Sequence, residues 1–452
     1  MNKLTIFCLL LCATMTFSFL SCGEDEQEVV PAEQPKDEKP APVEEPEQPQ
    51  GPFELIVPET NWPLTDSQLS QASCVNDFAF RLFRQLQEPG KSLVLSPLSV
   101  DYALGMLALG SDGETRDSLA SALGFDPKKP EEMHNLFASL MAYLPSVDEN
   151  VQLNLANALY LNAADPELGV NPDYQEVLKE SYQADCDTVD VTSQEGIDYM
   201  NAWCSKQTND FIPQIFNGSL PETTVATLIN ALYFKGKWVH PFKSDYNPME
   251  AFTREDGTKT RVPMMYFPYV EERLSYLETD SFQAIRLLYG EPMTADHPVD
   301  EDKQYFGMTV LLPRSGKTTS DILSWLSAEY VAELSIRMKK ERVCVHFPRF
   351  ETKVKTDLKQ SLHQLGLKFN ECDIRGIALK KGEPLGLILS DAFQMARISV
   401  NTEGTEAGAV TVLDVTGSGI CPNYFIANRP FVYLLTEQQT GTILFVGTYH
   451  GD

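Results

Sequence analysis

The chain has 452 residues, 43% of them hydrophobic and 22% charged, so it is long enough and apolar enough to bury a large core. Its formal net charge of −28 at pH 7 argues against nucleic acid as a partner, because replacing counterions on phosphates needs clustered Lys and Arg. The length alone would allow several domains, but the motifs below predict a single large one.

The first 21 residues are predicted to be a cleaved signal peptide. An apolar run follows Lys3 and ends at Ser21-Cys22, and it is too short for a comfortable membrane span. The Leu-Ser-Cys ending resembles the lipobox of bacterial lipoproteins, which implies lipidation of Cys22; the alternative is an ordinary signal with an incidental cysteine. The acidic residues directly after Cys22 resemble a surface-export signal, so we expect an outer-membrane anchor with the protein facing the extracellular space.

Residues 22–60 are predicted to be the lipidated cysteine and a disordered stalk. Prolines recur through this segment, and its many acidic residues are opposed only by Lys36 and Lys39. With few large apolar groups it cannot offset its ordering entropy, and like charge will keep it extended. The stalk would hold residues 61–452 clear of the membrane.

Residues 61–452 are predicted to form one α+β domain. Thr65 to Gln68 has the pattern of a capping box, and apolar residues at helical spacing follow it. Further helices are expected near 97–109, 114–123, 130–143, 194–209, 319–334 and 356–365. Strands are expected near 151–161, 224–234, 305–312, 342–350, 387–400, 424–435 and 442–449, with a hairpin turn at Thr440-Gly441.

The cysteines predict no metal site. The six that follow Cys22 form no CxxC pair, so neither zinc nor any other metal or cofactor is expected; they are Cys74, Cys186, Cys204, Cys344, Cys372 and Cys421. Disulfides are possible outside the cytoplasm, but the sequence cannot pair them.

A segment after Gly404 has the alternation of a strand but ends in loop composition. One face carries small and then apolar side chains, namely Thr405, Ala407, Ala409, Thr411, Leu413 and Val415. The other face is mixed, with Glu406, Gly408, Val410, Val412, Asp414 and Thr416. Taken alone, the pattern also fits an ordinary hairpin or a flexible turn.

Five ordered motifs make residues 65–450 resemble the serpin family of protease inhibitors. They are Ser96-Pro97-Leu98-Ser99, the stretch from Asn230 to Trp238, Phe347-Pro348-Arg349-Phe350, Asn428-Arg429-Pro430-Phe431 and the stretch from Gly441 to Gly447. The resemblance assigns the reactive-loop hinge to Thr402, Glu403, Gly404, Thr405, Glu406, Ala407, Gly408 and Ala409. It assigns the shutter and breach, two regions of the central sheet, to Ser96, Ser99, Asn230, Trp238 and Gln394.

Two residues depart from the family pattern. Thr402 stands where serpins usually carry Glu, and Gln394 stands where the shutter usually carries His. Gln can donate and accept hydrogen bonds, so a network with Ser96 and Asn230 remains possible, but it does not titrate near neutral pH.

The resemblance implies a monomeric suicide inhibitor that forms a covalent acyl complex with a target protease. The attacked bond is expected at Ser418 or Gly419, according to whether it is counted from the hinge or back from Pro430. No Arg or Lys lies between Gly404 and Asn428, so an elastase-like or subtilisin-like serine protease is expected, with a papain-like cysteine protease as the alternative. Cys421 lies just beyond this bond, either as an exposed thiol that pairs with another molecule or as a loop residue without a role.

Three competing interpretations remain open. The segment Gly417-Ser418-Gly419 lacks the spacing of a nucleophile elbow and no HExxH motif occurs, so no catalytic residues are assigned and an enzyme is not expected. A non-inhibitory serpin acting as a surface binding module is opposed by the small inward residues of the hinge. An unrelated surface lipoprotein that binds peptide or carbohydrate is opposed by the order of the five motifs.

Overall fold

The computed structural model describes residues 13–18, 55–60, 63–244, 246–267, 273–293, 303, 305–369, 373–405 and 422–452. The described helices are α1 (Asp66–Leu86), α2 (Pro97–Leu109), α3 (Gly113–Ala122), α4 (Pro130–Tyr143), α5 (Pro172–Ser181), α6 (Gln194–Gln207), α7 (Thr319–Trp325), α8 (Ala328–Arg337) and α9 (Lys359–Gln364). No helix in these ranges is long and apolar enough to cross a membrane.

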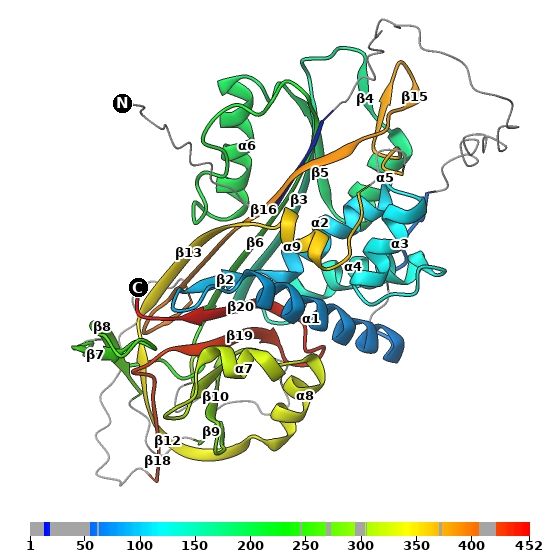
Figure 1. Ribbon diagram of the computed structural model, residues 1–452. Coiled ribbons are helices and arrows are strands. Elements are labelled where there is room, and N and C mark those ends of the chain that lie inside the picture. The colour runs from blue at the N-terminus through cyan, green and yellow to red at the C-terminus, as the bar shows by residue number, and fades with distance from the viewer. Residues whose placement is uncertain are drawn as a thin grey trace, which may run out of the picture.

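The central sheet runs the length of the molecule (Figure 1). Its described strands are β1 (Ala13–Ser18), β16 (Ile388–Val400), β17 (Gly404–Thr405), β6 (Thr224–Lys237), β3 (Val151–Asn162) and β5 (Ala184–Val189), with β13 (Phe350–Asp357) beside β16. All pairings in it are antiparallel except that of β3 with β5. The long strands β3, β6 and β16 are the frame on which the site is built.

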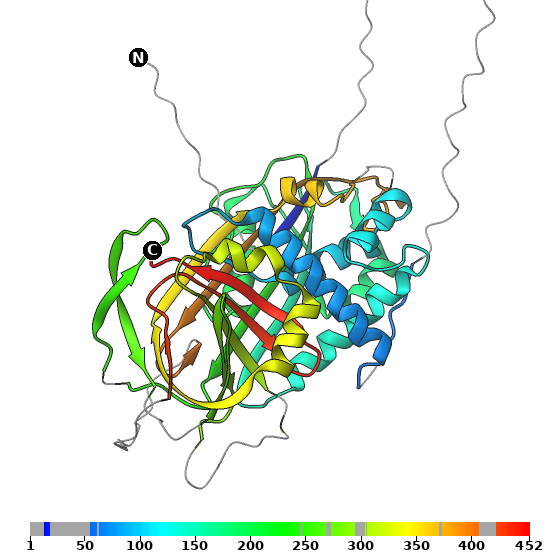
Figure 2. The same ribbon diagram turned by 60° about the horizontal axis from the view of Figure 1, so that its bottom comes forward.

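A second sheet packs across one end of the first (Figure 2). In order along the sheet it contains β2 (Leu93–Leu95), β20 (Ile443–Tyr449), β19 (Phe431–Glu437), β11 (Phe306–Pro313), β10 (Phe282–Tyr289), β9 (Arg273–Glu278), β12 (Lys339–Pro348), β8 (Lys259–Tyr266) and β7 (Met249–Thr253). The strand β18 (Asn423–Ile426) pairs in parallel with β12. A small third sheet joins β15 (Glu383–Pro384), β14 (Ala378–Lys380) and β4 (Leu168–Val170).

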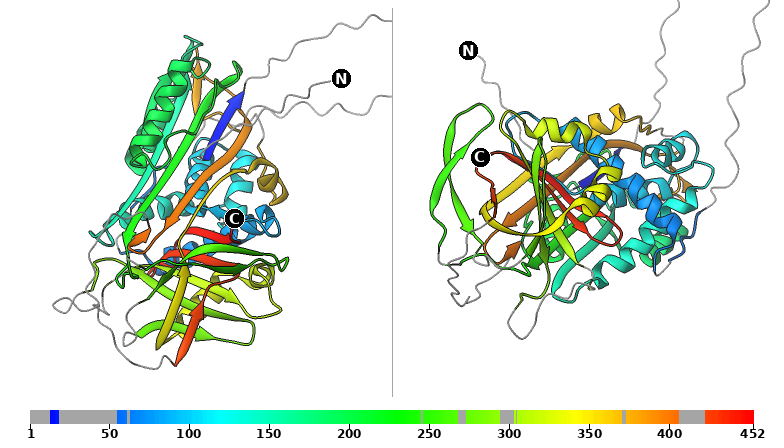
Figure 3. Two further views of the ribbon diagram at one scale, coloured as in Figure 1. Left: turned by 90° about the vertical axis from the view of Figure 1, so that its left-hand side faces the viewer. Right: turned by 90° about the horizontal axis from the view of Figure 1, so that it is seen from below.

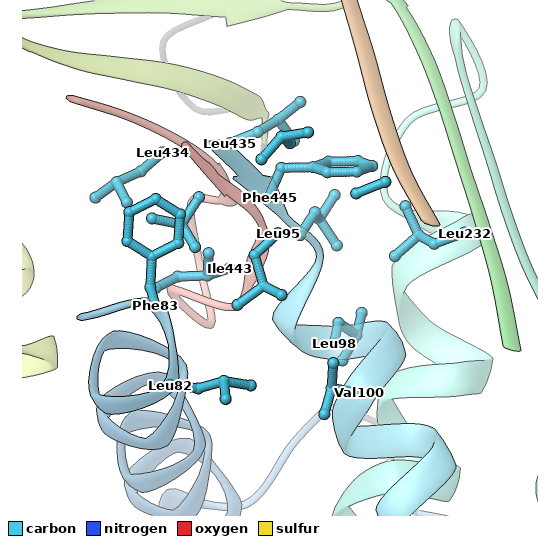
Figure 4. Packing of buried hydrophobic residues seen from close by; sticks show 14 of the residues in the cluster. Leu82, Phe83, Leu95, Leu98, Val100, Leu232, Leu434, Leu435, Ile443 and Phe445 are labelled. Atoms are coloured by element: carbon cyan, nitrogen blue, oxygen red, sulfur yellow. The ribbon is translucent and has the colours of Figure 1, made fainter. Parts of the chain in front are cut away.

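The two faces of the central sheet carry separate cores. The main core joins α1, α2, the second sheet and one face of β6; Figure 4 shows Phe83, Leu98, Leu232 and Phe445 converging in it. A smaller core on the opposite face packs α6 against β3 and β6 through residues such as Tyr160 and Ile229. Figure 3 shows α6 on its own side of the sheet. Successive residues of β6 therefore alternate between the two cores, as the strand period requires.

Most expected elements are present, and the differences have local causes. The capping box at Thr65 and Gln68 begins α1, and the hairpin turn before β20 has Gly441 at φ +70°. The region 319–334 is two helices, because Leu326 is extended and Ser327 caps a new helix. The strand expected at 424–435 is interrupted before Phe431, where Pro430 offers no backbone N–H for a ladder. The helix α5 and the strands β1, β2, β4, β5, β7 to β10 and β13 to β15 were not expected from the sequence.

Residues 55–60, at the end of the predicted stalk, lie against the domain. Leu55 and Ile56 pack on the main core, and the backbone N–H of Glu59 donates to Asn135 Oδ1 at 2.7 Å. The folded part of the chain therefore extends N-terminal to α1.

Candidate functional site at the hinge and the strand slot

The first hinge residues lie within the central sheet. The backbone N–H of Phe242 donates to the Thr402 carbonyl at 2.8 Å, and that of Trp238 donates to the Glu403 carbonyl at 2.7 Å. Gly404 and Thr405 then pair as β17 between β6 and β16. Thr402 is held through its carbonyl oxygen, a group that Glu at this position would also supply.

Asn401 shapes the turn that leads into the hinge. Its Oδ1 accepts the backbone N–H groups of Glu403 and Gly404 at 2.9 and 3.2 Å, and its own N–H donates to the Gly404 carbonyl at 2.9 Å. The Asn401 carbonyl accepts Trp238 Nε1–H at 2.9 Å. Sequence reasoning did not single out Asn401, although a side chain that accepts backbone N–H groups two and three residues on is typical of a turn.

Gly404 is required by the close approach of β6. A Cβ at this position would lie 2.0 Å from the Gly236 carbonyl oxygen, well inside any real contact. The glycine thus lets the chain pass directly beside β6 and enter the sheet.

Trp238 is the residue that the resemblance assigns to the breach. Its ring is 1% exposed and stacks on Tyr289 with centroids 4.3 Å apart. The Tyr289 hydroxyl shares a hydrogen bond of 2.7 Å with Thr405 Oγ1, and burial raises the pKa of Tyr289 far above its ordinary value. Tyr289 is a further site residue that no motif indicated.

The shutter is built from two separate polar contacts. Gln394 Oε1 accepts the Ser96 N–H at 2.8 Å while Gln394 Nε2 donates to the Ser96 carbonyl at 2.7 Å, and Ser96 Oγ donates to Ser99 Oγ at 3.1 Å. This joins the N-cap of α2 to the middle of β16 by a two-way amide contact. Among the described residues Asn230 makes no hydrogen bond to this group, so Gln394 is linked to Ser96 and Ser99 but not to Asn230.

Asn230 instead bonds to β3. Its Nδ2 donates to Asn157 Oδ1 at 2.7 Å, and Asn157 Nδ2 donates to the Tyr182 carbonyl at 2.7 Å. The Tyr182 hydroxyl lies 2.6 Å from His134 Nδ1, and burial lowers the pKa of His134 to about 3. Asn230 Oδ1 is buried and has no hydrogen-bond partner among the described residues, which is costly for a buried acceptor.

The facing edges of β6 and β16, from Gly236 and Val400 at one end to Thr224 and Ile388 at the other, are here called the strand slot. Thr405 in β17 pairs with both Gly236 and Val400, and Thr14 in β1 pairs with both Ile229 and Phe393. Both strands run antiparallel to both edges. The slot therefore holds short strands of one direction at two places.

β1 is formed by residues within the predicted signal peptide. A chain processed at Cys22 would lack this strand, and the corresponding part of the slot would be open to another segment of the protein. Cys22, Glu406, Ala407, Gly408, Ala409, Ser418 and Gly419 lie outside the described residues. In the ranges that the structure describes, no group of three or more His, Cys, Asp and Glu side chains is placed to hold a metal.

The comparisons agree with this architecture. The family model described as Serpin (serine protease inhibitor) matches residues 73–450. The chain therefore belongs to the serpin family, whose members are mostly inhibitors of proteases rather than enzymes.

Similar proteins come from animals and plants. Human neuroserpin is 26% identical over 82% of this chain and 90% of its own length. Mouse antithrombin-III is 30% identical over 84% of this chain and 81% of its own length. Wheat serpin-Z1C is 31% identical over 85% of this chain and 96% of its own length. Among solved structures, the native state of the thermophilic serpin tengpin aligns with a TM-score of 0.73 at 23% identity, covering 88% of this chain and 97% of its own. Human thyroxine-binding globulin also aligns with a TM-score of 0.73 at 23% identity, covering 84% of this chain and 98% of its own. At this level of identity both structures support the fold alone.

Proposed function

We propose that this serpin is a suicide inhibitor of endopeptidases in which cleavage of the reactive loop releases residues 405–416 into the strand slot. The observation that carries the proposal is the register of the slot. At β17 the two partners of Thr405 are Val400 and Gly236, and at β1 the two partners of Thr14 are Phe393 and Ile229. In both cases the residue number on β16 is 164 higher than that on β6, so the offset between the two edges is the same. A single straight strand that starts at Thr405 can therefore pair with both edges without a slip over this length.

The same register predicts the neighbours of each inserted residue. Counting on from Thr405, Ala407 would lie between Phe234 and Ile398, and Ala409 between Leu232 and Ala396. Thr411 would lie between Asn230 and Gln394, in the middle of the shutter. These flanking residues are all buried.

The inward face of the inserted strand would meet the main core. Phe234 and Leu232 belong to the main core, as do Ile398 and Ala396, whereas Tyr233 and Met395 belong to the smaller core beside α6. A segment in phase with Thr405 thus turns its small residues toward the main core. Interiors are packed to crystal density, so Ala and Thr can enter where larger or charged side chains would not.

The mechanism follows from the coupling of cleavage to insertion. A protease attacks the loop as a substrate and forms its acyl-enzyme. The cut frees the segment behind the hinge, which gains ladder hydrogen bonds and buries its inward face, as in the known use of serpin loop insertion. The attached protease is carried along, and inhibition results when insertion outruns deacylation.

The target is proposed to be an elastase-like or subtilisin-like serine protease. The bond at Ser418 or Gly419 is flanked by small residues, which fit a shallow specificity pocket. Papain-like cysteine proteases are the alternative, since Val415 precedes Thr416 in a pattern that suits them.

Incubation with pancreatic elastase and denaturing electrophoresis test the inhibitor proposal. We expect a complex that survives SDS, together with a rise in melting temperature of the cleaved protein. Cleavage without a complex and without a rise in melting temperature would overturn it and favour the non-inhibitory binding module. Parallel reactions with subtilisin and papain distinguish the protease classes.

We further propose that the mature protein is a monomer held at the outer-membrane surface by a lipid on Cys22. Metabolic labelling with a radioactive fatty acid should mark the protein, and Cys22→Ala should abolish the label. Surface exposure is measured by protease accessibility in intact cells. A labelled Cys22→Ala variant would contradict the anchor.

A further inference from the structure

One side-chain contact crosses the strand slot on the face that α6 covers. Arg397 on β16 and Tyr233 on β6 lie at the same level, each three residues along its edge from the Val400 and Gly236 that pair with β17. Phe211, in the segment between α6 and β6, contacts both side chains. The Arg397 guanidinium carbon lies 4.2 Å from the centre of the Phe211 ring, and the centre of the Tyr233 ring lies 6.0 Å from it. Phe211 therefore bridges the two edges of the slot.

Arg397 holds this bridge through its guanidinium. Its Nη1 donates to the Phe211 carbonyl at 2.7 Å, while its Nε and Nη2 both lie 3.0 Å from Glu351 Oε1 on β13. The ion pair is partly exposed, with side chains 24% and 46% accessible, so it contributes little to stability by itself. The charge-assisted hydrogen bond and the cation–π contact are what tie β16 to the segment that carries Phe211.

Residues 208–216, here called the covering segment, are fixed to α6. Asn201 of α6 accepts the backbone N–H groups of Ile215 and Phe216 through Oδ1, both at 2.8 Å, and its Nδ2 donates to the Phe216 carbonyl at 2.9 Å. Phe211 is 9% exposed and belongs to the smaller core beside α6. The covering segment is thus an ordered extension of α6 that lies over the slot at the level of the bridge.

The main core closes the slot on its other face. Phe234 and Ile398, the next residues along the two edges, are buried in that core. Interiors are packed to crystal density, so they leave no passage for a peptide chain. A strand that joins the sheet therefore enters from the α6 face, where the covering segment stands in its way.

We propose that Arg397 is a positioning residue that gates loop insertion by holding Phe211 across the slot. The gate rests on the proposed function, because it acts on the segment that cleavage releases. Insertion requires the contacts between Arg397 and Phe211 to break while the strand passes, and the covering segment to move aside with the end of α6. These contacts protect the uncleaved form against premature insertion and slow the insertion that follows cleavage.

Hydrogen exchange in the protein with its loop intact tests the bridge without any protease. Arg397→Met keeps a long apolar side chain but removes the guanidinium. We expect the amides of the covering segment to exchange about tenfold faster, because a hydrogen bond from a charged group is lost. Glu351→Gln is the matched control, since it removes the ion pair but keeps both contacts with Phe211. Unchanged exchange in Arg397→Met, or equal acceleration in both variants, would overturn the inference.

Elastase then tests what the gate does. At saturating elastase we expect the limiting rate of complex formation to rise by about tenfold in Arg397→Met, because the contact that must break on insertion is gone. Glu351→Gln should keep the wild-type rate. A lower melting temperature with an unchanged or lower limiting rate would make the contact merely structural and overturn the gate. If even the wild type forms no complex, the proposed function fails, whereas the exchange result still decides whether Arg397 holds the covering segment.

Discussion

The hinge end and the middle of the strand slot are held in different ways. At the hinge, Thr402 and Glu403 are bound through their carbonyl oxygens, which any residue would supply. At the shutter, Gln394 and Asn230 act through side-chain amides, and Asn230 Oδ1 has no partner in the described part of the chain. Main-chain pairing tolerates a change of residue, whereas a side-chain network depends on which residue is present.

This difference explains why the two departures from the serpin pattern have unequal consequences. Thr402 in place of Glu changes a side chain that makes no hydrogen bond within the described part of the chain. Gln394 in place of His keeps both a donor and an acceptor for Ser96 but removes a titratable group from the shutter. The hinge should therefore be sensitive to bulk and charge, and the shutter to hydrogen bonding.

The largest expected effect is at the hinge, with Thr405→Arg. Thr405 is 3% exposed, already lies in the sheet as β17 and shares a hydrogen bond with Tyr289, so Arg would place an unpaired charge at the point where insertion starts. A penalty of about 3 kcal/mol corresponds to roughly a hundredfold loss in the yield of complex. Electrophoresis after incubation with elastase should show cleavage without a complex.

Thr402→Arg is the matched control for this change. Thr402 is part-exposed and contributes its carbonyl, so this variant should still form the complex. If both variants lost the same amount of complex, the effect of Arg would not depend on whether the substituted side chain is buried.

A second change tests the close approach at the hinge. Gly404→Ala places a methyl group against the Gly236 carbonyl, and overpacking of this kind costs about 1 to 3 kcal/mol. We expect a lower melting temperature of the uncleaved protein at a fixed scan rate. Gly169→Ala, where no atom lies within 4 Å of the new Cβ, should leave it nearly unchanged. No decrease for Gly404→Ala would mean that β17 can leave the sheet without cost.

The sequence indicates patterns that are local along the chain, and it misses contacts between residues that are far apart in it. The period-two pattern after Gly404 and the helical spacing around α1 are local, so they can be found without the fold. The link from Asn230 through Asn157 and Tyr182 to His134 joins residues far apart in the chain. No spacing reveals such contacts, nor the stacking of Tyr289 on Trp238.

Short strands and turns were missed for a related reason. The strands β7 to β9 are partly exposed and mix polar with apolar residues, so their alternation is weak. The strand β10 is largely buried, but Gln283 and Arg286 interrupt its apolar run. The division of the region 319–334 depends on Ser327, a single capping residue within an otherwise helical pattern.

The acid sensitivity of the shutter is expected to come from His134. Burial lowers its pKa to about 3, whereas in the unfolded chain it is near 6.5. The unfolded state therefore takes up a proton first, and stability is lost as pH falls from about 6.5 towards 3. At pH 5 the loss is about 2 kcal/mol, so His134→Gln should reduce the change in unfolding free energy between pH 7 and pH 5 by that amount.

Chemical denaturation at the two pH values measures this effect. His363→Gln, at an exposed histidine, is the control and should retain the wild-type pH dependence. An unchanged pH dependence for His134→Gln would assign the acid sensitivity to another group, such as His240, whose pKa burial lowers to about 4.

The smallest expected effect concerns the shutter after insertion. The register places Thr411 between Asn230 and Gln394, where its hydroxyl can donate to the unpartnered Asn230 Oδ1. Thr411→Val preserves the shape but removes this donor, so the rise in stability on cleavage should fall by about 1 kcal/mol. Thr416→Val makes the same chemical change on the opposite face of the strand and should not reduce it. A fall for Thr416→Val and none for Thr411→Val would place the inserted strand one residue out of the inferred register, because a single-residue slip exchanges the two faces.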